Sequence, residues 1–61
     1  MNTPRYFEAV QRFQAAEDRL RLRLHEAAPR AVLEQAARDV IETAALVGRA
    51  RLENLARIAA A

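Results

Sequence analysis

The sequence predicts an all-α fold in which two helices form an antiparallel hairpin, and two hairpins pair into a four-helix bundle as a homodimer. Three observations predict it. Long stretches of Ala, Leu, Arg, Glu and Gln, which are strong helix formers, are interrupted by only one Gly and two Pro. Apolar residues recur at spacings of three and four, as they do on one face of a helix. The chain has only 61 residues, 15 of them Ala, so one hairpin has few large side chains with which to build a core of its own.

The first helix is predicted over about residues 4–27. Thr3 can cap the free N–H groups at its start, and Pro4 suits the first helical position because no hydrogen bond is needed from its nitrogen. Apolar residues at helical spacing predict the line that this helix buries. They are Tyr6, Val10, Phe13, Ala16, Leu20, Leu24 and Ala27.

A turn is predicted at residues 28–29. The ring of Pro29 disfavours helical geometry at Ala28 and removes one helix hydrogen bond. The segment has no Gly to end the first helix and no Ser, Asp or Asn to cap the second, so a single long helix kinked at Pro29 satisfies the same local rules. The pattern of apolar residues favours the hairpin over this alternative.

The second helix is predicted over about residues 30–59. When the chain folds at Pro29, positions whose numbers sum to about 57 lie opposite each other, and large side chains then often face small ones, as close packing requires. This register predicts a seam between the two apolar lines. The line on the second helix consists of Leu33, Ala37, Val40, Ala44, Val47, Leu55 and Ile58.

Both helices carry more apolar surface than this seam uses. The second helix outruns the first and has a second apolar line beside the seam, which one partner helix is too narrow to cover. Gly48 lies inside this helix, where it costs about 0.8–1 kcal/mol relative to Ala, and it indicates space for a bulky side chain of another chain. We expect this surplus to bind a second copy of the chain first and a client protein after that. The predicted interface residues are Phe7, Leu22, Ile41, Ala45, Gly48, Leu52, Leu55 and Ile58.

Two charged residues interrupt the apolar lines, Glu17 on the first helix and Arg51 on the second. A polar residue inside an interface can fix register or oligomeric state. The structural alternative is that each lies at the edge of its line, with Ala16 taking the core position beside Glu17.

The basic residues are all Arg, and the formal net charge is only +2. Candidates for phosphate contacts along the first helix are Arg12, Arg19 and Arg23. In length and in its two-helix plan the chain is similar to Rop-type plasmid RNA-binding proteins. This resemblance covers the architecture alone, and it implies a dimeric nucleic-acid-binding regulator as the alternative function. Acidic residues among the arginines favour an ordinary solvated face instead.

The side chains offer little for catalysis. The chain has no Ser or Cys, and its only His, His25, has no metal-binding residue three or four positions away. We therefore expect no catalytic, cofactor-binding or metal-binding site, and a non-enzymatic role as an adaptor, co-chaperone or regulatory subunit. No apolar run has the length of a membrane span, no signal-like stretch opens the sequence, and the use of Arg alone with abundant Ala suggests a GC-rich genome. A bacterial cytoplasmic protein is the resulting expectation.

Overall fold

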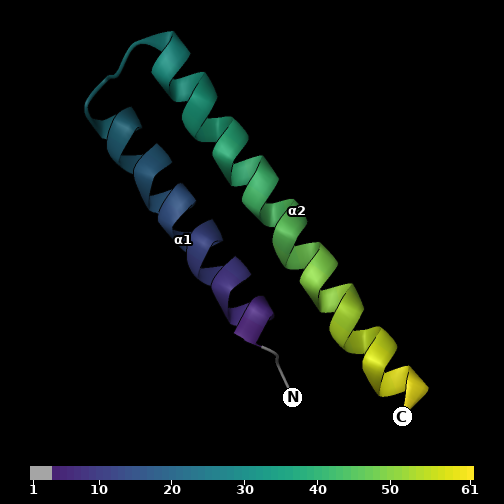
Figure 1. The fold of residues 1–61 in the computed structure, drawn as a ribbon. Coiled ribbons are helices and arrows are strands. Elements are labelled where there is room, and N and C mark those ends of the chain that lie inside the picture. The colour runs from purple at the N-terminus through teal and green to yellow at the C-terminus, as the bar shows by residue number, and fades with distance from the viewer. Residues whose placement is uncertain (1–3) are drawn as a thin grey trace.

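The computed structural model describes residues 4–61 and consists of two antiparallel helices, α1 (Pro4–His25) and α2 (Arg30–Ala60), joined by a short turn (Figure 1). The predicted hairpin is therefore confirmed over the alternative of one kinked helix. The Cα atoms extend over 49 × 14 × 10 Å, so the molecule is an elongated plate two helices wide. Compared with the predicted ranges, α1 ends two residues earlier and α2 ends one residue later.

The chain leaves α1 through a left-handed residue, Ala27, whose φ is 53°. The N–H of Ala27 donates to the carbonyl of Leu24 at 3.1 Å, and that of Ala28 donates to the carbonyl of Arg23 at 3.0 Å. This pair of bonds is the Schellman motif, in which Gly usually takes the left-handed position. Ala27 accordingly lies outside the helix and is exposed, so its predicted place in the seam is wrong.

The turn then starts α2 without a side-chain cap. Pro29 has an extended backbone, with φ −57° and ψ 152°. Its carbonyl accepts hydrogen bonds from the N–H groups of Val32 at 3.0 Å and Leu33 at 3.1 Å. The proline thus sets the entry into α2 through its fixed φ and its carbonyl, as its ring geometry allows.

The helices meet along alanines rather than along their largest residues. The buried apolar residues are Ala9 and Ala16 on α1 and Ala36 and Ala50 on α2, with exposed fractions of 2–7%. On each helix they fall on one line with a repeat of seven residues, and side chains this small let two helices approach closely. We call this line the alanine seam.

The predicted seam is confirmed at Ala16, which is buried, and is wrong at Leu24 and Ala44. Leu24 is 59% exposed, Ala44 is exposed, and most other members of the predicted lines are half-buried. The physical reason is that large residues at the point of closest approach would hold the helices apart. They lie beside the alanine seam instead, where they are only partly covered.

Two ion pairs between the helices define their register. Arg5 Nη1 lies 3.1 Å from Glu53 Oε2, and Arg19 Nη1 lies 3.9 Å from Asp39 Oδ2. The residue numbers in both pairs sum to 58, one more than the register expected from the apolar pattern.

In this register the end of α2 extends beyond the described part of α1. Asn54 is level with the first residue of α1, so residues 55–60 extend past that helix, as Figure 1 shows. We call residues 55–60 the overhang. Asn54 itself is 8% exposed, and its Oδ1 accepts no hydrogen bond from the residues that the structure describes. A buried polar atom without a partner is costly, and the sequence pattern gave no sign of it.

Candidate protein interface

The alanine seam divides the hairpin into two long faces of opposite character. On α1, Leu20 follows Ala16 by four residues and Arg12 precedes it by four, so the two side chains flank the seam on opposite sides. On α2, Val40 and Asp39 are separated in the same way. The apolar side chains of both helices therefore share one side of the plate, and charged side chains share the other.

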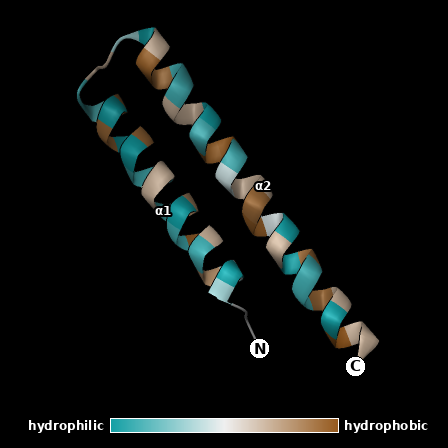
Figure 2. Cartoon of the chain, viewed as in Figure 1, coloured by the Kyte–Doolittle hydropathy of each residue, from teal (hydrophilic) through white to brown (hydrophobic). Residues whose placement is uncertain are grey.

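We call the first side the apolar face. Figure 2 shows hydrophobic segments recurring along both helices. Most side chains of this face are half-buried, and no apolar side chain larger than alanine is buried in the described part of the hairpin. The face is therefore an incomplete core, covered from one side only. Its members are Tyr6, Val10, Phe13, Leu20 and Leu24 on α1, and Leu33, Ala37, Val40, Ala44 and Val47 on α2.

Two of the predicted interface residues on α2, Ile41 and Gly48, widen the apolar face. Helical spacing places Ile41 and Gly48 next to Ala44, three residues before it and four after it. Ile41 is 68% exposed, and a Cβ added to Gly48 would meet nothing within 4 Å. Ile41 and Gly48 therefore remain open to a further surface. Ala45 and Leu52 are also exposed, but Leu52 lies two residues from Ala50 and thus on the side of α2 that points away from α1.

The overhang extends the same surface lengthwise. Leu55 is 51% exposed and Ile58 is 63% exposed, beyond the start of α1. No part of the described hairpin is long enough to cover them. The sequence predicts the second helix to be the longer one, and within the described residues Leu55 and Ile58 accordingly lie beyond the start of α1.

Phe7 and Leu22 stand apart from this surface. Both are exposed, at 55% and 52%, but Phe7 lies two residues from Ala9 and thus on the side of α1 that points away from α2. Its ring packs edge-on against that of Tyr6, with centroids 6.1 Å apart. Leu22 lies on the outer flank of α1 beyond the charged face. The structure does not bring these two residues together with the α2 group.

Two unpaired charges lie within the apolar face. Ala16 is 2% exposed while Glu17 is half-buried, which confirms that Ala16 takes the core position and Glu17 the edge. Arg51 is exposed, between Val47 and Ile58 on the same side of α2. Neither Glu17 nor Arg51 forms an ion pair with another of the described residues, 4–61.

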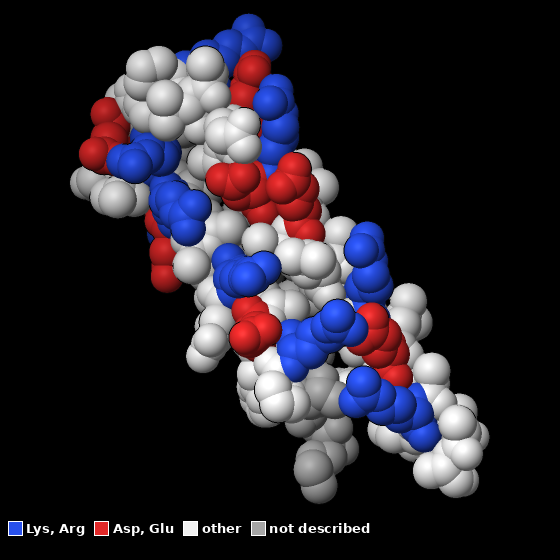
Figure 3. Space-filling view, in the orientation of Figure 1, with Lys and Arg blue, Asp and Glu red and all other residues white. Residues whose placement is uncertain are grey.

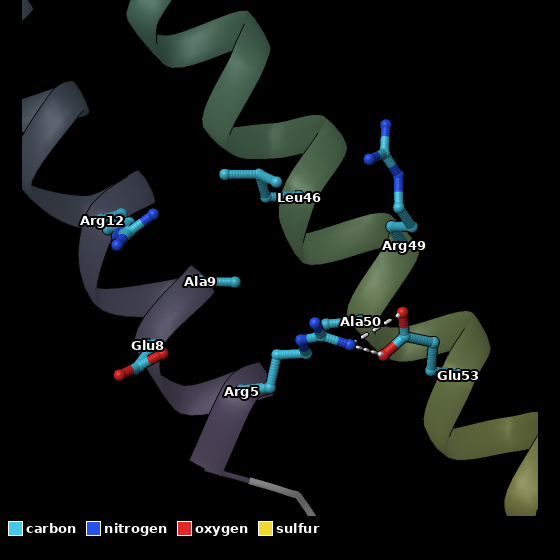
Figure 4. A pocket seen from close by; sticks show the side chains of 8 residues that line it. All are labelled: Arg5, Glu8, Ala9, Arg12, Leu46, Arg49, Ala50 and Glu53. Carbon is cyan, nitrogen blue, oxygen red and sulfur yellow. Dashed lines mark hydrogen bonds and ion pairs between the residues drawn. The ribbon is translucent and has the colours of Figure 1, made fainter.

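The opposite side, the charged face, carries interleaved arginines and carboxylates along both helices (Figure 3). Between the helices it is hollowed into an open groove of about 350 Å³. Figure 4 shows Arg5 reaching across this groove to Glu53, while Arg49 extends away from both. The groove is lined by Arg5, Glu8, Ala9, Arg12, Leu46, Arg49, Ala50 and Glu53.

The three arginines proposed for phosphate contacts have different surroundings. Arg19 pairs with Asp39, and Arg23 Nη1 lies 2.8 Å from Glu26 Oε1. Arg12 forms no ion pair within the described part of the chain, and it shares the groove with Arg49, which is likewise unpaired there. The sequence could not show the cross-helix pair of Arg19 with Asp39, because it depends on the rotation of each helix about its axis.

The described residues contain no group of three or more His, Asp or Glu side chains placed to hold a metal ion. Neither helix, over the residues described, combines the length and the apolarity that crossing a membrane requires.

Comparison with protein-family models, with curated proteins and with solved structures finds no match to this chain.

Proposed function

We propose that the chain is a non-enzymatic protein–protein interaction module that first binds a second copy of itself through the apolar face, forming a four-helix bundle. One observation carries the proposal. Among the described residues, all buried apolar residues are alanines, while large apolar side chains on or beside the apolar face are 51–68% exposed. They are Leu24, Ile41, Leu55 and Ile58.

The exposed area supports the same conclusion. The chain exposes 4892 Å² of surface, whereas a compact folded monomer of 6.9 kDa exposes about 4,000 Å². The excess of roughly 900 Å² is close to the approximately 800 Å² that each partner buries in a stable protein–protein interface. A second hairpin offers a matching apolar face of the same length.

Sedimentation equilibrium over a wide range of protein concentrations tests this proposal. We expect a mass twice the 6.9 kDa of the chain at high concentration, and helicity that falls as the dimer dissociates on dilution. A monomer that stays fully helical at all concentrations would contradict the proposal. A role as an adaptor, co-chaperone or regulatory subunit then rests on the apolar area that the dimer leaves exposed, such as Phe7 and Leu22.

Nucleic-acid binding is our second candidate, favoured by one observation: the unpaired Arg12 and Arg49 line the same groove. Carboxylates of Glu8 and Glu53 in that groove offset much of the positive charge. If the groove binds phosphate, affinity for RNA or DNA falls steeply with added salt and is lost in an Arg12→Gln, Arg49→Gln variant. Binding that is absent, or insensitive to salt, would exclude this candidate.

A further inference from the structure

The two helices contribute side chains of unequal size to the apolar face, and this difference indicates how the second copy docks. We propose that the two hairpins pack with their turns at the same end, so that α1 of each copy lies on α2 of the other and Val10 fills the space over the partner subunit's Gly48. The inference rests on the self-association proposed above and adds its direction and its register.

The apolar face stands higher along α1 than along α2. On α1 its middle consists of large half-buried side chains, among them Val10 and Phe13. On α2 the middle is small, because Ala44 and Gly48 are both exposed and a Cβ added to Gly48 would meet nothing within 4 Å. Close packing of two such faces requires the high side of each to meet the low side of the other.

A two-fold axis along the length of the hairpin meets this requirement. It places α1 of one copy on α2 of the other, and it leaves every residue at its own height along the bundle. The register of the two ion pairs, whose residue numbers sum to 58, therefore also applies between the copies. It brings Val10 level with the partner subunit's Gly48, and it brings Phe13 within one residue of the partner subunit's Ala44.

Val10 and Gly48 also lie on the same side of this contact. Helical spacing turns Val10 further from the alanine seam than Phe13, and it turns Gly48 further from the seam than Ala44. Both positions therefore lie toward the outer edge at which α1 meets the partner's α2. The open space at Gly48 thus receives a side chain of matching height and direction.

Turns at opposite ends give a poorer fit. The two-fold axis is then perpendicular to the helices, and it stacks α1 on α1 and α2 on α2. When the axis passes the midpoint of α2, which is Ala45, the two copies of Phe13 are level with each other. Large side chains then hold one pair of helices apart, while Ala44 and Gly48 meet small side chains across the other pair.

The same-end arrangement also gives surroundings to the rest of the apolar face. Glu17 lies at the edge of the contact, where Arg21, an exposed cation four residues later on the same helix, is its neighbour. Both overhangs project from one end of the dimer, opposite the two turns. Leu55 and Ile58 therefore remain exposed and leave apolar surface for a client protein.

Spin labels measure the direction of packing. Arg30→Cys places the label at the exposed first residue of α2, in a chain that has no other Cys. The same-end dimer holds the two labels at one height, within about 30 Å across the bundle. The opposite-end dimer, with its axis at the midpoint of α2, separates them by about 45 Å along the bundle.

A pair of charges introduced at positions 10 and 48 tests the register, with association measured by sedimentation and helicity by circular dichroism. Val10→Glu and Gly48→Arg each place unpaired charges in their own homodimers. In an equimolar mixture the new carboxylate of one chain lies level with the new guanidinium of the other, so we expect heterodimers at least about tenfold tighter than the mean of the two homodimers.

Gln11→Glu is the matched control, because position 11 is exposed on the outer side of α1. Mixing it with Gly48→Arg should give no gain in affinity. The opposite-end dimer does not bring positions 10 and 48 together, so it predicts no gain for either mixture.

The failures are distinguishable. If the wild type dimerises but the labels lie more than about 40 Å apart, or if the Val10→Glu and Gly48→Arg mixture gains no affinity, the same-end arrangement is wrong while self-association stands. A wild type that stays monomeric overturns both proposals.

Discussion

The apolar face and the charged face flank the same alanine seam, but only the apolar face consists of large apolar side chains that are half-buried. On the charged face, Arg5 and Arg19 form ion pairs with carboxylates of the other helix, and these arginine side chains are largely exposed. On the apolar face, Leu20 and Val40 lie in equivalent positions and remain half-buried. The comparison teaches that close approach of two helices and burial of large side chains are separate requirements. The hairpin meets the first by itself, and we propose that a second copy of the chain meets the second.

The largest effect on self-association is expected when a charge is placed on the apolar face, and the same change on the charged face is the comparison. Leu20→Glu puts a carboxylate in the apolar face, and we expect self-association to weaken at least about 100-fold, since an unpaired charge buried there costs about 3 kcal/mol. Leu46→Glu is the matched control on the charged face, where Arg12 and Arg49 line the same groove. Sedimentation equilibrium compares them. Equal weakening by both variants would contradict the division into two faces.

Enlarging the alanine seam tests the requirement for close approach. Ala16→Leu adds a large side chain where the residue is 2% exposed, and we expect a loss of about 1–3 kcal/mol in the free energy of unfolding. Ala15→Leu, at the exposed neighbouring position, should change it by less than about 0.5 kcal/mol. Urea denaturation followed by circular dichroism measures both. An unchanged Ala16→Leu variant would show that the helices are not held by the alanine seam.

A substitution in the turn changes the stability of the hairpin while leaving the apolar face and the charged face unchanged. Ala27→Gly relieves a left-handed alanine with φ 53°, so we expect stability to rise by about 1 kcal/mol. Ala28→Gly, where φ is not positive, should lower it slightly because Gly loses more backbone entropy on folding. Thermal denaturation at one fixed protein concentration is the measurement. A stabilised Ala28→Gly variant would point away from the Schellman motif.

The smallest effect is expected on the charged face. Arg5 and Glu53 have exposed fractions of 71% and 40%, so solvent screens their ion pair. A double-mutant cycle with Arg5→Gln and Glu53→Gln should give a coupling of about 0.2–1 kcal/mol that shrinks in high salt. A coupling above about 2 kcal/mol would mean that the charged face contributes as much to stability as the alanine seam.

The sequence was sufficient to predict the hairpin but not its centre. The positions of the two helices follow from local properties, Pro29 and the apolar spacings. Folding the chain at Pro29 then predicts their register to within one residue. Ala9, Ala36 and Ala50 escaped prediction, since alanine is common everywhere in this chain and carries little weight in a hydrophobic pattern. Only the distance between the helix axes makes it the favoured residue at the point of contact.

The candidate interface could likewise be predicted only in part from the sequence. Leu55 and Ile58 could be recognised because they lie beyond the reach of the first helix, a question of length alone. The position of Phe7 on the far side of α1, and the pairing of Arg19 with Asp39, depend on the rotation of each helix about its axis. That rotation is set by the alanine seam, which the apolar pattern did not reveal.

The alanine seam has a consequence for the lifetime of the protein. Four buried alanines contribute little free energy, so a lone hairpin opens readily and exposes its backbone to proteases. If the apolar face closes only in a dimer, the protected fraction rises with the amount of chain present. Newly made chains would then be degraded quickly when scarce and persist once abundant, and a pulse-chase measurement at two expression levels would show this as a longer half-life at the higher level.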